Sequence, residues 1–374
     1  MGGGLAGLVA SIHLTRLGVA CKVFEKRSYP FHRVCGEYIS NEVAPYLTSL
    51  GIYPKELRPS HIRRFQLTSV NGKTASLPLD LGGFGISRHQ FDYFLYRQAA
   101  KLGVEFHLNT EVEKITFSDD HFMIKTNSEV HDADLVIGSF GKRSKLDVDL
   151  HRSFIQLRSP YVGVKYHIRM QNFPDDLIAL HNFKNGYCGI SRVEDDVINL
   201  CYLSHRDNLK THGSIPAMEK AVLHRNPFLE SIFKGAEFLF DKPEVINEIS
   251  FETKGPLAHH ILMTGDAAGM ITPLCGNGMA IAIHSSKLLS EHVLHFCSNK
   301  NYSREQLEKD YAKSWKVHFA GRLWAGRQIQ KLFGSEWTSN AAVAMANRTK
   351  PLANYLIRKT HGTSFDLSLP VGDV

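Results

Sequence analysis

The sequence lacks several patterns that define well-known protein classes. Its six cysteines are scattered without a C-x-x-C pair, so neither a zinc site nor a disulfide framework is indicated. A membrane-spanning helix needs about 20 uninterrupted apolar residues, and no stretch of this sequence is that long. The most apolar run, 267–283, is broken by Pro273, Gly276 and Gly278. The chain opens on glycines and not on a basic segment followed by an apolar block, which argues against a secretory signal. We therefore expect a cytoplasmic protein.

Metal-binding and hydrolase motifs are also absent. The chain has 20 histidines, but it contains no H-E-x-x-H sequence and no comparable cluster. The only adjacent pair, His259 and His260, precedes a short predicted strand, and we interpret it as a surface turn. G-x-S-x-G is missing, so nothing supports Ser-His-Asp catalysis. We predict no metal site.

The composition is that of an ordinary globular protein, but its charge is uneven. With 374 residues, 43% hydrophobic and 22% charged, the chain is long enough for two domains. The net charge is +7, and residues 312–365 hold nine Lys or Arg, a single acid (Glu336) and all three tryptophans, Trp315, Trp324 and Trp337. This region is either a solvated helical face with tryptophans in the core or a peripheral membrane contact. No nucleic-acid-binding motif accompanies the charge, so we expect no nucleic acid partner.

Apolar periodicity predicts alternating helices and strands in the first part of the chain. The predicted helices are 5–17, 88–102, 278–297 and most of the chain after 302. The predicted strands are 20–25, 105–108, 111–117, 122–126, 134–137, 161–170, 177–184, 187–193, 197–203 and 261–264. Turn residues separate the four strands between 161 and 203, which indicates an antiparallel sheet.

These elements predict an α/β fold, α+β overall, with a Rossmann-like domain interrupted by the antiparallel sheet. We assign 1–60, 88–150 and 255–298 to a discontinuous cofactor-binding domain. Residues 61–87 and 151–254 form the predicted substrate domain, and 299–374 form a C-terminal helical region.

The glycine-rich start of the chain has the spacing of a dinucleotide-binding turn. Gly2, Gly4 and Gly7 form G-x-G-x-x-G ahead of a predicted helix. The first glycine permits a tight turn, the second lets a pyrophosphate approach the backbone, and the third allows close helix packing. Glu25 ends the next predicted strand, where a carboxylate can accept hydrogen bonds from a ribose.

This motif normally follows a β-strand, but here only Met1 precedes it. The first and most central strand of the sheet would then be missing, which would leave its neighbours without hydrogen-bond partners. We interpret the sequence as truncated before this strand. The alternative is a decayed protein that binds its dinucleotide cofactor weakly and has no catalytic activity.

Four motifs in order resemble the flavoprotein class that includes geranylgeranyl reductases, aromatic-ring hydroxylases and flavin-dependent halogenases. They are the glycine turn with Glu25, the R-x-x-F-D-x-x-L sequence that begins at Arg88, the segment 133–144, and the segment 262–279. The third is similar to a strand followed by G-A-D-G-x-x-S. The fourth, L-M-T-G-D-A-A-G continued by P-L-C-G-N-G-M, is the most specific.

The resemblance implies FAD as the cofactor, with NAD(P)H as electron donor. Asp266 would bind the ribityl chain, and the helix from Gly278 would direct its positive end at the flavin. The implied cofactor-binding residues are Gly2, Gly4, Gly7, Glu25, Arg88, Gly265, Asp266, Gly276, Asn277, Gly278 and Met279. Phe140 replaces the usual aspartate of the third motif, which puts the handling of the pyridine nucleotide in question.

Two segments and one further residue bear on the reaction. The sequence from His32 to Glu37 resembles the K-x-C-G-G/E segment of the reductases, which implies that Cys35 is a catalytic residue; the alternative is a buried small hydrophobe. Gly269 is typical of reductases and halogenases, where ring hydroxylases have histidine. Residues 186–192 replace an aromatic-rich reductase motif, which weakens the assignment to prenyl reductases, and no halogenase signature is evident. We expect the substrate domain to form an apolar pocket over the flavin ring, lined by Tyr166, Phe183 and Tyr202.

The sequence therefore predicts an FAD-dependent, NAD(P)H-driven oxidoreductase. It would reduce a C=C bond of a lipophilic small molecule, or hydroxylate it. Neither the oligomeric state nor the identity of the substrate is indicated.

Overall fold

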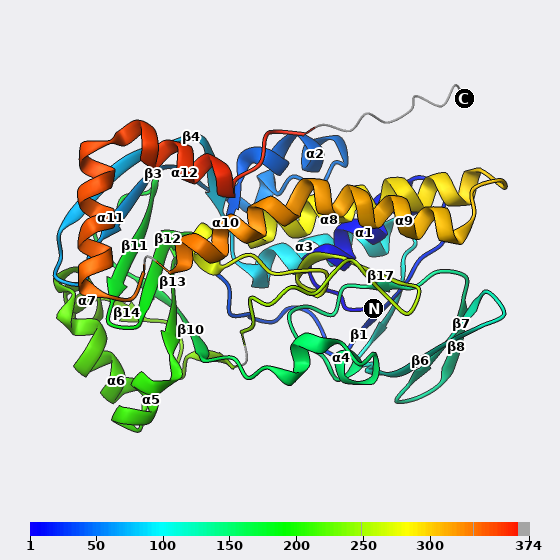
Figure 1. The fold of residues 1–374 in the computed structure, drawn as a ribbon, viewed down its shortest axis with the longest axis horizontal. Coiled ribbons are helices and arrows are strands. Elements are labelled where there is room, and N and C mark those ends of the chain that lie inside the picture. The colour runs from blue at the N-terminus through cyan, green and yellow to red at the C-terminus, as the bar shows by residue number, and fades with distance from the viewer. Residues whose placement is uncertain (248, 332, 366–374) are drawn as a thin grey trace.

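The computed structural model describes residues 1–247, 249–331 and 333–365 and has a mixed α/β fold (Figure 1). The helices are α1 (Leu5–Arg16), α2 (Ala44–Ser49), α3 (Arg88–Lys101), α4 (Lys145–Asp149), α5 (Arg206–His212), α6 (Ile215–Val222), α7 (Pro227–Gly235), α8 (Gly278–Ser298), α9 (Arg304–Trp315), α10 (Gly321–Gln330), α11 (Glu336–Arg348) and α12 (Lys350–Thr360).

Each predicted strand has an observed counterpart, but seven observed strands were not predicted: 38–40, 60–68, 74–85, 130–133, 237–238, 244–247 and 257–258. The observed strands are β1 (Lys22–Glu25), β2 (Tyr38–Ser40), β3 (Ser60–Thr68), β4 (Thr74–Gly85), β5 (Glu105–Leu108), β6 (Val112–Ser118), β7 (His121–Thr126), β8 (Val130–Ala133), β9 (Ile137–Gly138), β10 (Tyr161–Arg169), β11 (Leu177–Phe183), β12 (Gly186–Arg192), β13 (Ile198–His205), β14 (Glu237–Phe238), β15 (Glu244–Asn247), β16 (Leu257–Ala258) and β17 (Ile261–Met263). The predicted strand 134–137 is wrong in its bounds. Residues 130–133 form β8, which pairs with β7. Only residues 137–138 form β9, which pairs with β17.

One large sheet contains most strands of the predicted substrate domain. Its order is β14-β10-β13-β12-β11-β3-β4-β2, and β15 also pairs with β10. β10 to β13 are antiparallel neighbours, as predicted. β3 joins them by parallel pairing with β11, so the segments before and after residue 150 meet in one sheet. β2, from the segment assigned to the cofactor-binding domain, lies at its edge.

Helices cover both faces of this sheet. Met218 of α6 and Leu229 of α7 pack with Val164 and Leu200 in one apolar core. Val343 and Ala346 of α11 belong to a second core, which includes Leu67 of β3. Figure 1 shows α11 and α12 at one side of the sheet and α5 to α7 at another. α11 therefore packs on the large sheet, whereas α9 packs with α8 in the core of the Rossmann-like part, and the predicted domain bounds stay a prediction.

The Rossmann-like part contains two small parallel pairings, β1 with β5 and β9 with β17. Met1 and Gly2 lie between them: Gly2 N donates to Phe24 O at 2.8 Å, and Ser139 N donates to Met1 O at 2.9 Å. These backbone hydrogen bonds connect the two pairs of strands. α1 packs against α8, where Ser286 Oγ donates to Ala6 O at 2.8 Å.

The region after residue 302 is helical through Thr360, as predicted, and residues 366–374 lie outside the described part. Its tryptophans differ in environment. Trp315 is only 4% exposed and packs near Gly269, whereas Trp324 is 60% and Trp337 is 80% exposed. Core packing thus accounts for one of the three, and membrane contact stays a prediction. Among the described residues, none of the helices combines the length and apolarity that crossing a bilayer requires.

Substitution of Trp315 by alanine should destabilise the protein by about 3–5 kcal/mol, because it leaves a cavity in the core where α9 meets the loop before α8. The matched control is Trp324→Ala, which should change stability by no more than about 0.5 kcal/mol because its side chain is exposed. Urea unfolding of both variants measures the difference. Equal effects would show that α9 does not anchor the C-terminal region.

Candidate functional site

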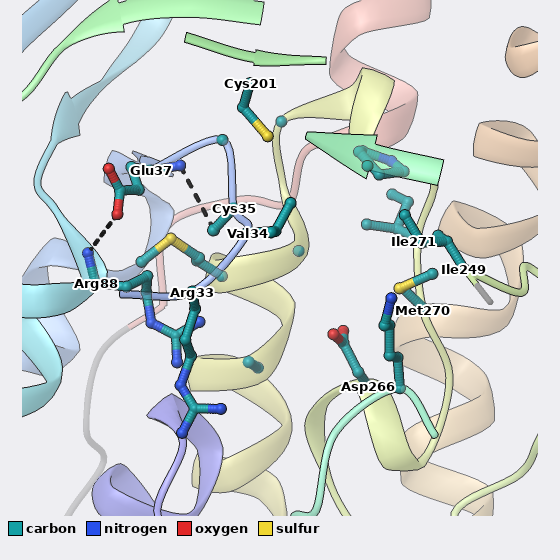
Figure 2. Close-up of a pocket in the computed structure, with 18 of the residues that line it drawn as sticks. Arg33, Val34, Cys35, Glu37, Arg88, Cys201, Ile249, Asp266, Met270 and Ile271 are labelled. Atoms are coloured by element: carbon teal, nitrogen blue, oxygen red, sulfur yellow. Dashed lines mark hydrogen bonds between the residues drawn. The ribbon is translucent and has the colours of Figure 1, made fainter. Parts of the chain in front are cut away.

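A cavity of about 670 Å³ lies between the Rossmann-like part and the large sheet (Figure 2). It brings together residues that are far apart in the sequence. The predicted site residues that line it are Gly2, Gly4, Glu25, Cys35, Arg88, Gly265, Asp266, Gly276, Gly278 and Met279. Gly7 and Asn277 are not part of its wall. Asn277 is fully buried, and its Nδ2 donates to Thr360 O at 2.9 Å, so its side chain holds the end of α12.

The three glycines of the turn are required for different reasons. Gly2 has φ +94°, and a Cβ there would lie 2.5 Å from Ser139 O. At Gly7 a Cβ would lie 2.2 Å from Gly2 O, so this glycine permits α1 to pack against the turn. At Gly4 the nearest atom to a Cβ would be Arg88 Nη2 at 3.8 Å. Gly4 therefore leaves open space on the cavity side of the turn.

Glu25 fixes the turn from the end of β1. Its Oε2 accepts from Gly3 N at 2.9 Å, and its Oε1 accepts from Arg27 N at 3.1 Å. The side chain is almost fully buried and lines the cavity. Because a carboxylate can accept about four hydrogen bonds, Glu25 retains capacity for a ribose hydroxyl.

Two helices begin at the cavity without a side-chain cap. α1 starts after Gly4, α8 starts after Asn277, and neither preceding residue accepts a capping hydrogen bond. The first N–H groups of a helix lack internal partners and carry partial positive charge. An open glycine cradle and uncapped helix starts fit the pyrophosphate and the anionic ring edge of FAD.

Arg88 is held rigidly at the start of α3. Its Nε and Nη2 donate to the two oxygens of Asp92 at 2.6 and 2.7 Å. Ser87 caps this helix by accepting from Gln90 N at 3.1 Å. The guanidinium therefore reaches the cavity beside Gly4 in a fixed orientation.

Asp266 projects its carboxylate into the cavity from the loop after β17, as Figure 2 shows. Burial raises the pKa of this carboxyl, while Lys254 and Arg88 act in the opposite direction. Lys254 Nζ also donates to the Asp266 backbone oxygen at 2.8 Å. The carboxylate has no hydrogen-bond partner within the described chain, so it is available to a hydroxyl-bearing ligand.

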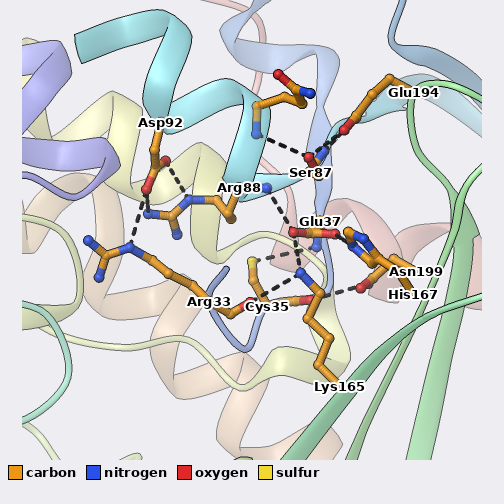
Figure 3. A network of polar contacts seen from close by, with 11 residues as sticks. Arg33, Cys35, Glu37, Ser87, Arg88, Asp92, Lys165, His167, Glu194 and Asn199 are labelled. Carbon is orange, nitrogen blue, oxygen red and sulfur yellow. Dashed lines mark hydrogen bonds and ion pairs between the residues drawn. The ribbon is translucent and has the colours of Figure 1, made fainter. Parts of the chain in front are cut away.

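Glu37 is the centre of a buried polar network (Figure 3). Oε1 accepts from Lys165 Nζ and, at 2.7 Å, from Arg88 N, while Oε2 accepts from His167 Nε2 at 2.7 Å. Glu37 and Lys165 are both 0% exposed. Burial alone would raise the Glu37 pKa, but Lys165 and His167 lower it to about 2. The carboxylate is therefore charged at neutral pH, and it joins β10 to the segment that carries Cys35.

Cys35 lies in this segment at the cavity wall. Its Sγ accepts from Glu37 N at 3.5 Å, and its carbonyl accepts from Asn199 Nδ2 at 3.2 Å. Burial raises the pKa of the Cys35 thiol. A protonated thiol at neutral pH is suited to donate a proton and poorly suited to act as a nucleophile.

The far end of the cavity is apolar. Its walls come from β3, β4, β11, β12, the loop before α8, and α11 and α12, and include Phe65, Leu67, Leu77, Leu180, Tyr187, Met270, Phe333, Ala342, Met345, Ala346 and Ile357. The predicted aromatic lining is wrong for Tyr166 and Phe183, which pack in the core under α6 and α7. Tyr202 borders the cavity, but its hydroxyl donates to Glu219 at 2.8 Å.

Sequence reasoning missed Lys165, His167 and the C-terminal wall. A signal for the first two was present, because they occupy alternate positions, together with Arg169, of the mostly apolar strand 161–170 and so share one face of it. Nothing local indicated that α11 and α12 would close the cavity.

Substitution of Lys165 by methionine should destabilise the protein by about 3–5 kcal/mol, because it leaves the Glu37 carboxylate buried without its main counter-charge. The double variant Lys165→Met with Glu37→Gln should recover part of this loss. Lys234→Met, which breaks an exposed pair with Glu230 on α7, serves as control and should cost less than about 0.5 kcal/mol. Denaturant unfolding at pH 7 measures all three. A Lys165→Met variant as stable as the control would contradict the role of the network.

Comparisons with known proteins place the sequence beside flavin enzymes. No protein-family model matches it. It is 23% identical to conditioned medium factor receptor 1 of Dictyostelium discoideum, over 85% of this chain and 67% of that protein. It is 25% identical to digeranylgeranylglycerophospholipid reductase of Methanococcus vannielii, over 84% of this chain and 81% of the reductase. A shorter match, 31% identical over 32% of this chain and 25% of the relative, links it to flavin-dependent halogenase armH3 of Armillaria mellea.

Solved structures show the same fold. The flavin-dependent halogenase CmlS has a TM-score of 0.75 at 20% identity and covers 98% of this chain, which spans 67% of CmlS. A geranylgeranyl bacteriochlorophyll reductase-like protein from Thermoplasma acidophilum has a TM-score of 0.75 at 19% identity, over 93% of this chain and 90% of that one. The relatives and the fold match the class that the motifs predict, the FAD-dependent oxidoreductases.

Proposed function

We propose that this protein reduces a C=C bond of a lipophilic small molecule, with FAD as cofactor and NAD(P)H as electron donor. The observation that carries the proposal is one continuous cavity with two chemically different ends. One end has the glycine turn, Glu25 and Asp266, and the other has apolar walls. Cys35 lines the same cavity.

The polar end suits a dinucleotide. The uncapped starts of α1 and α8 offer N–H groups to anionic atoms, and Arg88 adds a fixed positive charge beside Gly4. Asp266 and Glu25 supply carboxylates for hydroxyl groups. When bound, FAD supplies a hydride-transfer centre that takes reducing equivalents from a nicotinamide.

The apolar end suits a substrate with a hydrocarbon chain. Leu67 and Leu77 of the sheet line it together with Ala342 and Ala346 of α11, whose small side chains occupy little of the space. Burial of apolar substrate surface there is favourable by about 25 cal/mol per Å². These walls also exclude water from the reacting part of the substrate.

Cys35 is the proton donor in this proposal. Reduction of a C=C bond requires a proton as well as a hydride, and the burial that raises the thiol pKa keeps a proton on Sγ at neutral pH. Glu37 N and Asn199 Nδ2 hold the Cys35 segment in place. The negative charge of the Glu37 carboxylate is stabilised by contacts with Lys165 and His167, so this carboxylate does not compete for the proton of Cys35.

Gly4→Ala tests the cofactor end. A methyl group would enter the space reserved for pyrophosphate without a local clash, so the variant should fold and bind FAD at least about tenfold more weakly, a difference of about 1.4 kcal/mol. Gly235→Ala is the matched control, since a Cβ there meets nothing within 4 Å and Gly235 is not in the cavity wall. Quenching of flavin fluorescence measures binding. Absence of flavin bands near about 370 and 450 nm in wild-type protein supplied with FAD would instead favour a decayed flavoprotein.

Cys35→Ala tests the reaction. Under anaerobic conditions, NADH or NADPH should bleach the flavin band, and geranylgeraniol, an apolar alcohol with several C=C bonds, should restore it. We expect Cys35→Ala to slow this second step by about 100-fold or more, because a positioned general acid contributes about 10²–10⁴-fold. The exposed Cys297→Ala is the control and should behave like wild type. Reoxidation only by O2, with an oxygenated product, would contradict the reductase assignment in favour of hydroxylation.

A further inference from the structure

We propose that His107, Glu129 and His131 form a binding site for a divalent transition-metal ion of the Zn²⁺ type. One ligand atom from each of the three residues lies within 4.8 Å of the others. None of them lines the cavity, so the site is separate from the proposed reaction. No sequence motif indicates the cluster, because its members come from different small sheets.

The fold brings the two histidines together around one aromatic residue. His107 lies on β5 opposite Phe24 of β1, and His131 lies on β8. The Phe24 ring centroid is 4.9 Å from that of His107 and 4.8 Å from that of His131. The two imidazole centroids are 4.8 Å apart. Packing on Phe24, which is only 6% exposed, therefore restricts both rings before any ion binds.

An unsatisfied nitrogen supports a ligand at this position. The buried Nε2 of His131 has no hydrogen-bond partner in the described part of the chain. Leaving a buried polar atom unpaired costs about 1–3 kcal/mol, and coordination to a metal would remove this cost. Nε2 of His107 lies 2.7 Å from Glu105 Oε1. A carboxylate on one ring nitrogen orients a histidine and makes its other nitrogen a better ligand.

The donor set selects the kind of ion. Two imidazole nitrogens and one carboxylate oxygen suit Zn²⁺ and its first-row neighbours, whereas Mg²⁺ and Ca²⁺ prefer oxygen ligands alone. Glu129 is exposed in the turn between β7 and β8, so an ion can reach the site from solvent. Bound there, the ion would tie the three-stranded sheet β6–β7–β8 to β5 of the two-stranded sheet. Its role would be to stabilise the fold.

Calorimetric titration of chelator-treated full-length protein with ZnCl2 tests the proposal. We expect one saturable site and a rise in Tm with added Zn²⁺, because an ion that binds only the folded state stabilises it. His131→Gln and Glu129→Gln should each weaken binding by about tenfold or more, since even outer-shell changes at metal sites cost about 10–100-fold. Addition of Co²⁺ should give visible absorption bands that disappear in the same variants.

His121→Gln is the matched control, because His121 lies on the adjacent strand β7, outside the cluster, and should leave Zn²⁺ affinity unchanged. Should His131→Gln fail to fold, Glu129→Gln still decides the question, since its side chain is exposed. Absence of saturable Zn²⁺ binding to the wild-type protein would overturn the proposal. Equal affinity in wild type and Glu129→Gln would overturn it as well, because the ion would then bind elsewhere.

Discussion

The buried carboxylate of Glu37 is the interaction on which the arrangement of the two parts depends. It is fully buried and would be strongly unfavourable without compensation. Lys165 and His167 from β10 of the large sheet, and the backbone N–H of Arg88 at the start of α3, provide that compensation. These partners come from both parts of the molecule, so the negative charge of Glu37 is compensated only when the large sheet and the Rossmann-like part pack together in this arrangement. This requirement also fixes the segment that presents Cys35.

The cavity lies where these two parts of the molecule meet. Its polar end combines backbone groups, namely the glycine turn and the starts of two helices, with the charged side chains of Glu25, Arg88 and Asp266. Its apolar end is built from side chains of the sheet and of α11 and α12. The polar end therefore suits a dinucleotide cofactor, and the apolar end suits an apolar ligand.

Much of the fold and the polar end could be predicted from sequence, because both depend on local patterns. The turn formed by Gly2, Gly4 and Gly7 requires particular backbone angles and close approaches, which restrict the residue type at each position. Apolar periodicity predicted the helices α1, α3 and α8 and the strands β10 to β13, which pair as predicted, but it did not predict β3, β4 or the helices α5 to α7. The predicted strand 134–137 was wrong in its bounds because a short apolar run does not show which of two sheets it will join.

Only the tertiary structure decided which distant side chains meet. Lys165 contacts Glu37, which lies 128 residues away in the sequence. From the sequence alone, Lys165 could be interpreted only as a charged residue on one face of a strand. Tyr166 and Phe183 were expected at the cavity but face the opposite core, because strand alternation fixes relative orientation and not which face will be covered by which helices. The sequence by itself determined the cofactor turn, whose geometry is local. The apolar cavity walls and the His107–His131 cluster arise from packing between elements, which no local pattern encodes.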